Sequence, residues 1–161
     1  MQPSQSKILR MKKIYFALVI GLLSVAAGCS KDFLKSYEDR IEGTWRLVDV
    51  DRRGIGGSVN NMIFQGGTFN FSEAGDLTYT KENGEIYQGS WNIDKRWTSG
   101  DCYGNNNCQD RRVRTLNVVA VNFTTQDVKA ENFEEIEFTG TNRFNAYIYS
   151  GLHTYIFRFR R

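Results

Sequence analysis

The sequence has few of the residue types from which most metal and catalytic sites are built. Its 161 residues include one histidine, three cysteines and one proline. A structural zinc site needs four Cys or His ligands, and one histidine beside widely spaced cysteines does not supply them. The proline, Pro3, lies close to the amino terminus, so later turns must rely on glycine and asparagine, which tolerate positive φ. We expect neither a metal nor a cofactor.

Without its amino-terminal segment, the chain also has no excess of positive or negative charge. The whole chain has 21 Lys and Arg against 18 Asp and Glu, a net charge of +3. Residues 1–28 hold four of the basic residues and no acidic one, which leaves 17 against 18. Binding of nucleic acid requires a basic patch or stripe. We therefore expect no nucleic-acid partner.

The amino terminus has the pattern of an export signal. Lys12 and Lys13 end a basic region, and residues 14–27 form a 14-residue apolar segment. A membrane-spanning helix needs about 20 apolar residues, so this segment is short for a span and fits the core of a secretory signal. The small residues Ala26, Ala27 and Gly28 then lead into a cysteine.

This segment, ending at Cys29, resembles the lipobox of bacterial lipoproteins, although Ala26 stands where the family prefers leucine. The resemblance implies that residues 1–28 are a cleaved signal peptide and that Cys29 receives a diacylglycerol. Residues 29–42 would then form a lipid-anchored tether and a short helix. It also implies a place in the bacterial outer membrane or cell envelope. An ordinary signal peptide cut elsewhere, or an uncleaved anchor, is the alternative.

Two further cysteines, Cys102 and Cys108, lie six positions apart in a polar segment. An even pair in an exported protein indicates a disulfide that closes a small loop. A zinc site is the weaker interpretation, because two further ligands are missing.

Alternation of apolar and polar residues from Gly43 onward predicts an all-β domain over residues 43–161. We expect eight strands, at residues 44–51, 68–72, 76–80, 86–93, 112–123, 134–139, 143–149 and 153–160. Short links between successive strands favour an eight-stranded antiparallel up-and-down β-barrel, preceded by a short helical segment, because closure removes exposed sheet edges.

In such a meander, alternate loops share one end of the barrel. The end away from the amino terminus would hold residues 52–67, 81–85, 124–133 and 150–152. The first of these loops carries Met62, Ile63 and Phe64, which predicts a lid that gates a small apolar pocket. On the outer surface, Arg112 and Arg114 are expected to pair with Glu135 and Glu137 across adjacent strands.

The motif Gly43-Thr44-Trp45, opening the first strand of this meander, resembles the lipocalin family. The chain is most similar to lipocalin-like lipoproteins of Bacteroidetes. This similarity rests on the motif, on the lipobox and on the stretch FNFSEAGDLTYTKENGEIYQGSWNI. In lipocalins an arginine near the end of the last strand packs across the tryptophan and helps to close the barrel base. The resemblance gives that role to Arg158 or Arg160.

Aromatic residues are abundant, with 11 Phe, 8 Tyr and 3 Trp. Eight strands enclose a space that side chains fill or that holds one small ligand. The first functional hypothesis is therefore a binding protein for a small hydrophobic ligand, lined by Phe69, Phe71, Tyr79, Tyr87, Trp91, Phe144 and Tyr155. The alternative is a filled barrel that contacts an envelope protein or glycan through its loops, with Trp97 and Tyr103 as an exposed platform.

No set of residues typical of catalysis is found. His153 is alone and lacks an accompanying nucleophile motif. Glu135 and Glu137 share one strand face, which fits a solvated surface better than an acid–base pair. The glycine-rich residues 54–57 lack the Lys-Ser/Thr of a phosphate-binding loop. We expect that the protein is not an enzyme.

Overall fold

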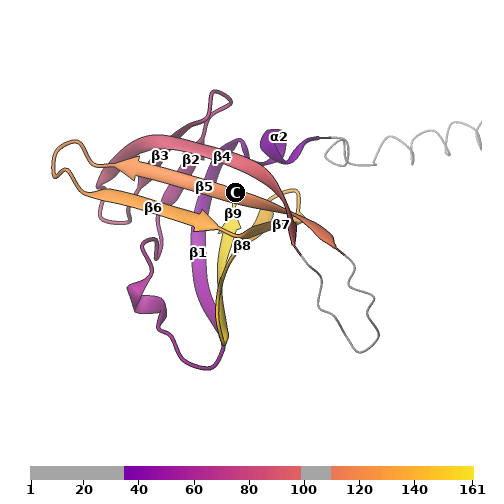
Figure 1. The fold of residues 1–161 in the computed structure, drawn as a ribbon. Helices are drawn as coiled ribbons and strands as arrows, with labels where there is room; N and C mark the ends of the chain where they lie inside the picture. The colour runs from indigo at the N-terminus through magenta and orange to yellow at the C-terminus, as the bar shows by residue number, and fades with distance from the viewer. Residues whose placement is uncertain (1–34, 99–109) are drawn as a thin grey trace, which may run out of the picture. The chain divides into compact units, whose positions relative to one another are not determined.

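One antiparallel sheet forms most of the structure, a computed structural model that describes residues 35–98 and 110–161. Within these two ranges, one α-helix and one 3-10 turn accompany the sheet (Figure 1). The elements are α2 (Tyr37–Ile41), β1 (Gly43–Gly54), η2 (Val59–Asn61), β2 (Thr68–Phe71), β3 (Asp76–Thr80), β4 (Ile86–Thr98), β5 (Arg111–Val121), β6 (Val128–Phe133), β7 (Glu135–Gly140), β8 (Arg143–Ser150) and β9 (His153–Arg160). The all-β prediction is confirmed. No helix in these two ranges is long and apolar enough to cross a bilayer.

The sheet differs from the expected barrel in strand number and in closure. Its order is β6-β5-β4-β3-β2-β1-β9-β8-β7, so it has nine strands and two edges. Strand β6 was not predicted, because its segment was assigned to a loop. The ladder is therefore an open sheet and not the closed eight-stranded barrel that the sequence suggested.

The two edge strands are consecutive in the chain, with Glu134 alone between them. Strand β6 pairs with β5, and β7 pairs with β8, so the chain passes from one edge of the sheet to the other at this residue. The amide of Glu134 donates to the carbonyl of Tyr147 at 2.8 Å. Arg111 of β5 also reaches Glu135 of β7 through two bonds of 2.6 and 2.7 Å. The sheet is thus curled until its edges lie side by side.

Aromatic side chains fill the concave side of the sheet. The register places Trp45 opposite Phe69, and Phe69 opposite Tyr79, which continues the inward row across β1, β2 and β3. These three side chains are buried. Phe144 and Phe159 stack from β8 and β9 with ring centroids 4.4 Å apart. Burial of such rings is the main stabilising contribution in a core of this size.

Helix α2 covers one end of this core. It starts with a capping box, in which Ser36 accepts from the amide of Asp39 and Asp39 accepts from the amide of Ser36. Ile41 is fully buried, and its carbonyl accepts a bond from the indole Nε1 of Trp45 at 2.5 Å. The predicted short helix before the sheet is present, and it ties the start of β1 to the core.

The arginine above Trp45 is not the one implied by the resemblance. The guanidinium of Arg161 lies 4.4 Å from the Trp45 ring centroid. Arg158 instead pairs with Asp49 and Asp51 on the outer face of the sheet. Strand alternation is the reason, because Phe157 and Phe159 of β9 point inward, and position 161 shares their side.

The expected pairing of Arg112 and Arg114 with Glu135 and Glu137 is also wrong. Arg111, one residue earlier, makes the ion pair with Glu135. Arg112 lies over the ring of Trp97, and Arg114 lies over the ring of Tyr37. The sequence register between β5 and β7 was therefore misjudged, because β6 intervenes between them along the chain.

Four loops lie at the end of the sheet opposite α2, as the alternation of strand directions predicts. Ile55 donates to the carbonyl of Leu152, which joins the β1–β2 and β8–β9 loops. Tyr87, beside the β3–β4 turn, donates to Asp127 of the β5–β6 loop at 2.8 Å. We call this the loop end, formed by residues 55–67, 81–85, 122–127 and 151–152.

Candidate functional site

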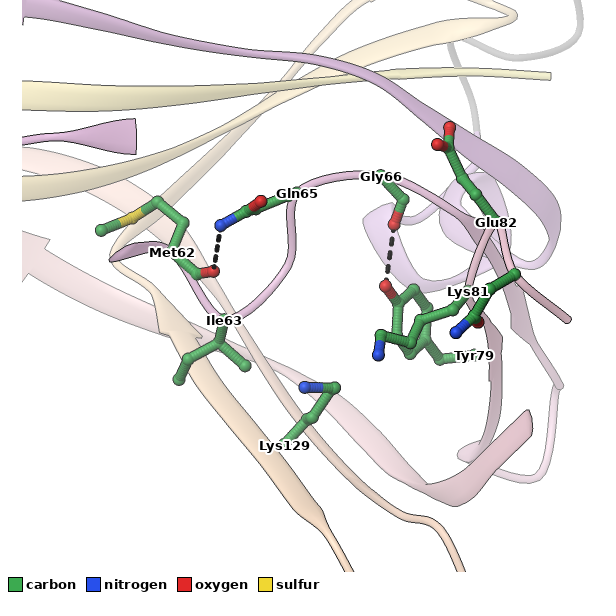
Figure 2. A pocket seen from close by; sticks show the side chains of 9 residues that line it. Met62, Ile63, Gln65, Gly66, Tyr79, Lys81, Glu82 and Lys129 are labelled. Atoms are coloured by element: carbon green, nitrogen blue, oxygen red, sulfur yellow. Dashed lines mark hydrogen bonds between the residues drawn. The ribbon is translucent and has the colours of Figure 1, made fainter. Parts of the chain in front are cut away.

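The loop end contains an open pocket with a volume of about 560 Å³. Figure 2 shows side chains from the β1–β2 loop on one side, the end of β3 on another, and Lys129 of β6 below. The lining residues are Met62, Ile63, Gln65, Gly66, Tyr79, Lys81, Glu82, Asn83 and Lys129. The volume falls within the range of small-molecule sites in proteins.

The β1–β2 loop separates this pocket from the aromatic core. Phe64 is fully buried beneath the loop, with its ring centroid 5.1 Å from that of Phe69 and 4.9 Å from that of Tyr79. Its neighbour Ile63 remains exposed at the pocket. The loop expected to act as a lid thus covers the end of the core with the side chain of Phe64. Gating by this loop stays a prediction.

Hydrogen bonds hold the loop in this conformation. The side-chain amide of Gln65 donates to the carbonyls of Asn60 and Met62, at 2.5 and 3.3 Å. Gly67 has φ +96, and a Cβ there would lie 2.5 Å from the carbonyl oxygen of Thr80. Glycine is therefore required where the loop enters β2.

Tyr79 connects the pocket to the core. Its ring packs against Phe64, and its hydroxyl donates to the carbonyl of Gly66 at 2.9 Å (Figure 2). Burial raises the pKa of Tyr79 to about 12, with smaller contributions from Glu82 and Glu85. The phenol is therefore protonated at neutral pH and does not serve as a base there.

The charges around the pocket are balanced. Lys81 pairs with Glu85 at 2.8 Å, and Lys129 pairs with Asp127 at 3.4 Å. Hydrogen bonding from Lys81 lowers the pKa of Glu85.

A hydrogen bond from Tyr87 likewise lowers the pKa of Asp127. Glu82 lies 3.9 Å from Arg46, and both side chains are largely exposed. The site therefore offers ammonium and amide donors, carboxylate and carbonyl acceptors, and no strong excess of either charge.

Two features of the described residues bear on catalysis and metal binding. His153 packs edge-on against Tyr155, with ring centroids 4.9 Å apart, and it does not line the pocket. Across residues 35–98 and 110–161, no group of three or more His, Cys, Asp or Glu side chains is placed to hold a metal ion.

The seven residues proposed to line an interior cavity are all buried. Six of the seven rings contact one another or further core rings, as in the pairs Phe69–Phe71, Phe71–Trp91 and Tyr79–Tyr87, and the ring of Tyr155 contacts His153. Of the seven, Tyr79 alone lines the open pocket. Their role as ligand contacts stays a prediction. The seven residues proposed to line the cavity are Phe69, Phe71, Tyr79, Tyr87, Trp91, Phe144 and Tyr155.

From the sequence, the loops of this pocket were expected at one end of the sheet, but most of the lining side chains were not proposed as a site. Lys81, Glu82 and Lys129 come from a turn and from the strand that was not predicted. The alternation of Lys129, Glu131 and Phe133 on one face of β6 was the available signal, but two of the three are charged. Burial of Glu131, which raises the pKa of its carboxyl, shows that a charged residue here faces partly inward.

Several predicted residues lie outside the described part of the chain, namely Cys29, Cys102, Cys108 and Tyr103. The lipidation and disulfide predictions therefore stay predictions. Gly43 and Trp45 lie at the start of β1 as expected, with Trp45 fully buried.

Comparisons with known proteins add no further constraint on the site. The chain matches no protein-family model, no curated protein and no solved structure.

Proposed function

We propose that the protein is a lipid-anchored binding protein of the bacterial envelope, without catalytic activity, related to the lipocalin-like lipoproteins. Cys29 supplies the anchor, and the curled open sheet is a variant of the lipocalin fold whose two edge strands join at the bend at Glu134. The ligand is a neutral sugar or short glycan, and it binds in the pocket at the loop end.

The observation that carries this proposal is the division between core and pocket. The inward side chains are buried and in ring-to-ring contact, while the open volume lies outside Phe64. This arrangement favours a filled barrel that works through its loops over a barrel that encloses a hydrophobic ligand.

The chemistry of the pocket supports a sugar. Each hydroxyl of a sugar both donates and accepts a hydrogen bond, and the pocket presents both kinds of partner from Gln65, Glu82 and Lys129. Met62 and Ile63 provide an apolar surface for the C–H face of a sugar ring. The balanced charges do not favour a strongly anionic or cationic ligand.

Calorimetric titration with neutral oligosaccharides from bacterial envelopes tests the proposal, with a long-chain fatty acid as the competing ligand class. We expect sugar binding by the wild type and at least about a tenfold loss, or about 1.4 kcal/mol, in the Glu82→Gln and Lys129→Met variants. Gln88→Ala, on the exposed outer face of β4, is the control and should bind as the wild type does. Fatty-acid binding without sugar binding would support the hydrophobic-ligand alternative instead.

A further inference from the structure

The far end of the β4–β5 hairpin carries a second surface, unrelated to the pocket. Residues 95–98 and 111–114 contain five Lys or Arg residues and no Asp or Glu. The register pairs Lys95 with Arg114 and Trp97 with Arg112, so these four side chains share one face of the hairpin. We call this the basic tip, formed by Lys95, Arg96, Trp97, Arg111, Arg112 and Arg114.

Trp97 is the unusual member of the basic tip. It is 62% exposed, whereas the other two tryptophans, Trp45 and Trp91, are buried. The guanidinium of Arg112 lies 4.7 Å from the centroid of its ring. An exposed tryptophan beside arginines is the combination found at the boundary between a membrane and water, where the indole sits at headgroup depth.

Most of the positive charge of the basic tip is uncompensated. Arg111 is paired with Glu135 at 2.6 Å. Lys95, Arg96, Arg112 and Arg114 form no ion pair with any carboxylate in the described ranges. Asp94 and Asp110 flank the tip along the described chain, and the carboxylate of Asp94 accepts hydrogen bonds from Asn92 and Asn117. The basic tip therefore has unpaired positive charges that can bind an anionic partner.

The basic tip lies close to where the chain enters the domain. The guanidinium of Arg114 is 5.2 Å from the ring centroid of Tyr37, the first residue of α2. Tyr37 is eight positions after Cys29, and eight steps along a fully extended chain span at most about 29 Å. A lipid on Cys29 would therefore keep Tyr37, with Arg114 beside it, within that reach of the bilayer.

We propose that the basic tip docks on the anionic phospholipid surface of the membrane that holds the anchor, and this inference rests on the proposed lipidation of Cys29. Arginine and lysine bind lipid phosphates, and Trp97 inserts at headgroup level. The amino-terminal end of the sheet faces the membrane, and the loop end with its pocket faces away from it. A membrane is favoured over a nucleic acid because the chain after residue 28 has no overall basic charge.

Tryptophan fluorescence of the lipidated protein in vesicles tests this orientation. The vesicles contain phosphatidylethanolamine with phosphatidylglycerol, or phosphatidylcholine alone, and carry brominated acyl chains as the quencher. We expect quenching of Trp97 in the phosphatidylglycerol vesicles at about 0.1 M salt, and its loss near 1 M salt, where charges are screened beyond about 3 Å.

Variants separate the basic tip from the rest of the molecule. Trp97→Phe leaves the buried Trp45 and Trp91 as the background signal, and Lys95→Glu with Arg112→Glu should reduce quenching to that background. Arg53→Glu, at an exposed residue beside the loop end, makes the charge change of one of these two substitutions and should leave quenching unaltered.

Flotation of the vesicles distinguishes failure of the anchor from failure of the docking surface. Protein that floats with the vesicles but shows no quenching of Trp97 would overturn the docking proposal and leave the anchor intact. Equal quenching in phosphatidylcholine vesicles would overturn the role of anionic lipid. Protein that does not float would overturn both the anchor and the docking surface that depends on it.

Discussion

At the scale of single residues, the inward or outward side of a strand decides what a charged group does. Arg158 and Arg161 are three positions apart, yet one pairs with Asp49 and Asp51 outside the sheet and the other covers Trp45. Alternation from Phe157 and Phe159 was enough to assign Arg161 to the inner side. The resemblance alone pointed to the wrong arginine. It indicated the end of the last strand but not which arginine there lies on the inner face of the sheet.

Replacement of Arg161 tests this assignment. Arg161→Ala removes the contact with Trp45 and the bonds to the carbonyls of Arg40 and Glu42, so we expect a loss of about 1–2 kcal/mol in the free energy of unfolding. Arg160→Ala, on the exposed side, should change it by less than about 0.5 kcal/mol. Urea unfolding of both variants measures the difference, and equal losses would show that the side chains do not differ in role.

The hydroxyl of Tyr79 gives a prediction for alkaline pH. Burial raises its pKa to about 12 from the ordinary value of 10.0. A group with a raised pKa contributes stability that is full below the unfolded value and is lost as pH rises through the folded value. We therefore expect Tyr79→Phe to be less stable than the wild type at neutral pH, by about 1 kcal/mol for the bond to Gly66. That difference should shrink between pH 10 and 12. Chemical unfolding at a series of pH values measures it, and a constant difference over this range would contradict the prediction.

At the scale of elements, the β4–β5 pair depends on a close approach of the two backbones. A Cβ on Gly89 would lie 1.9 Å from the carbonyl oxygen of Val119, so no side chain fits at that position. Glycine inside a strand often marks such an approach or a tight bend. Alternation with Tyr87 and Trp91 puts Gly89 on the inner face of β4, but a single sequence gives no distance between backbones.

Gly89→Ala should therefore disturb the pairing of β4 with β5. We expect a loss of about 2–3 kcal/mol in the free energy of unfolding, because the contact is with backbone that has little room to move. Gly140→Ala is the matched control, since a Cβ there meets no atom within 4 Å. Thermal and urea unfolding compare the two, and a neutral Gly89→Ala would show that the strands can separate without cost.

Strands could be predicted from the sequence where apolar and polar residues alternate clearly. Strand β9 was predicted at its observed bounds, because the aromatic residues Tyr155, Phe157 and Phe159 occupy alternate positions. Strand β6 was missed because Lys129 and Glu131 occupy its partly inward positions. The loops that form the pocket were predicted to share one end of the sheet, but their polar side chains were not proposed as a site, because three segments far apart in sequence form the pocket wall.

At the scale of the whole domain, the two ends of the sheet have different chemistry. The α2 end has the basic tip and the entry of the chain, while the loop end has the polar pocket. A core of buried, largely aromatic residues lies between the two ends, and its burial stabilises the sheet. The proposed function assigns attachment to the first end and ligand binding to the second.

Attachment through Cys29 predicts where the protein is found in cells. Cys29→Ser should move the protein from the membrane fraction to the soluble fraction after ultracentrifugation, because no diacylglycerol is added without the thiol. Cys102→Ser makes the same substitution elsewhere and should leave the protein with the membrane. Unchanged fractionation of Cys29→Ser would contradict lipidation at this residue.

Chemical-shift mapping by NMR tests the central claim that ligand binds outside the aromatic core. On titration with a neutral envelope oligosaccharide, the account predicts shifts centred on residues 62–66 and 81–83 and on Lys129, with the amides of Phe69, Phe71 and Phe144 unmoved. Shifts centred on those core residues, produced by a fatty acid and not by the sugar, would contradict it.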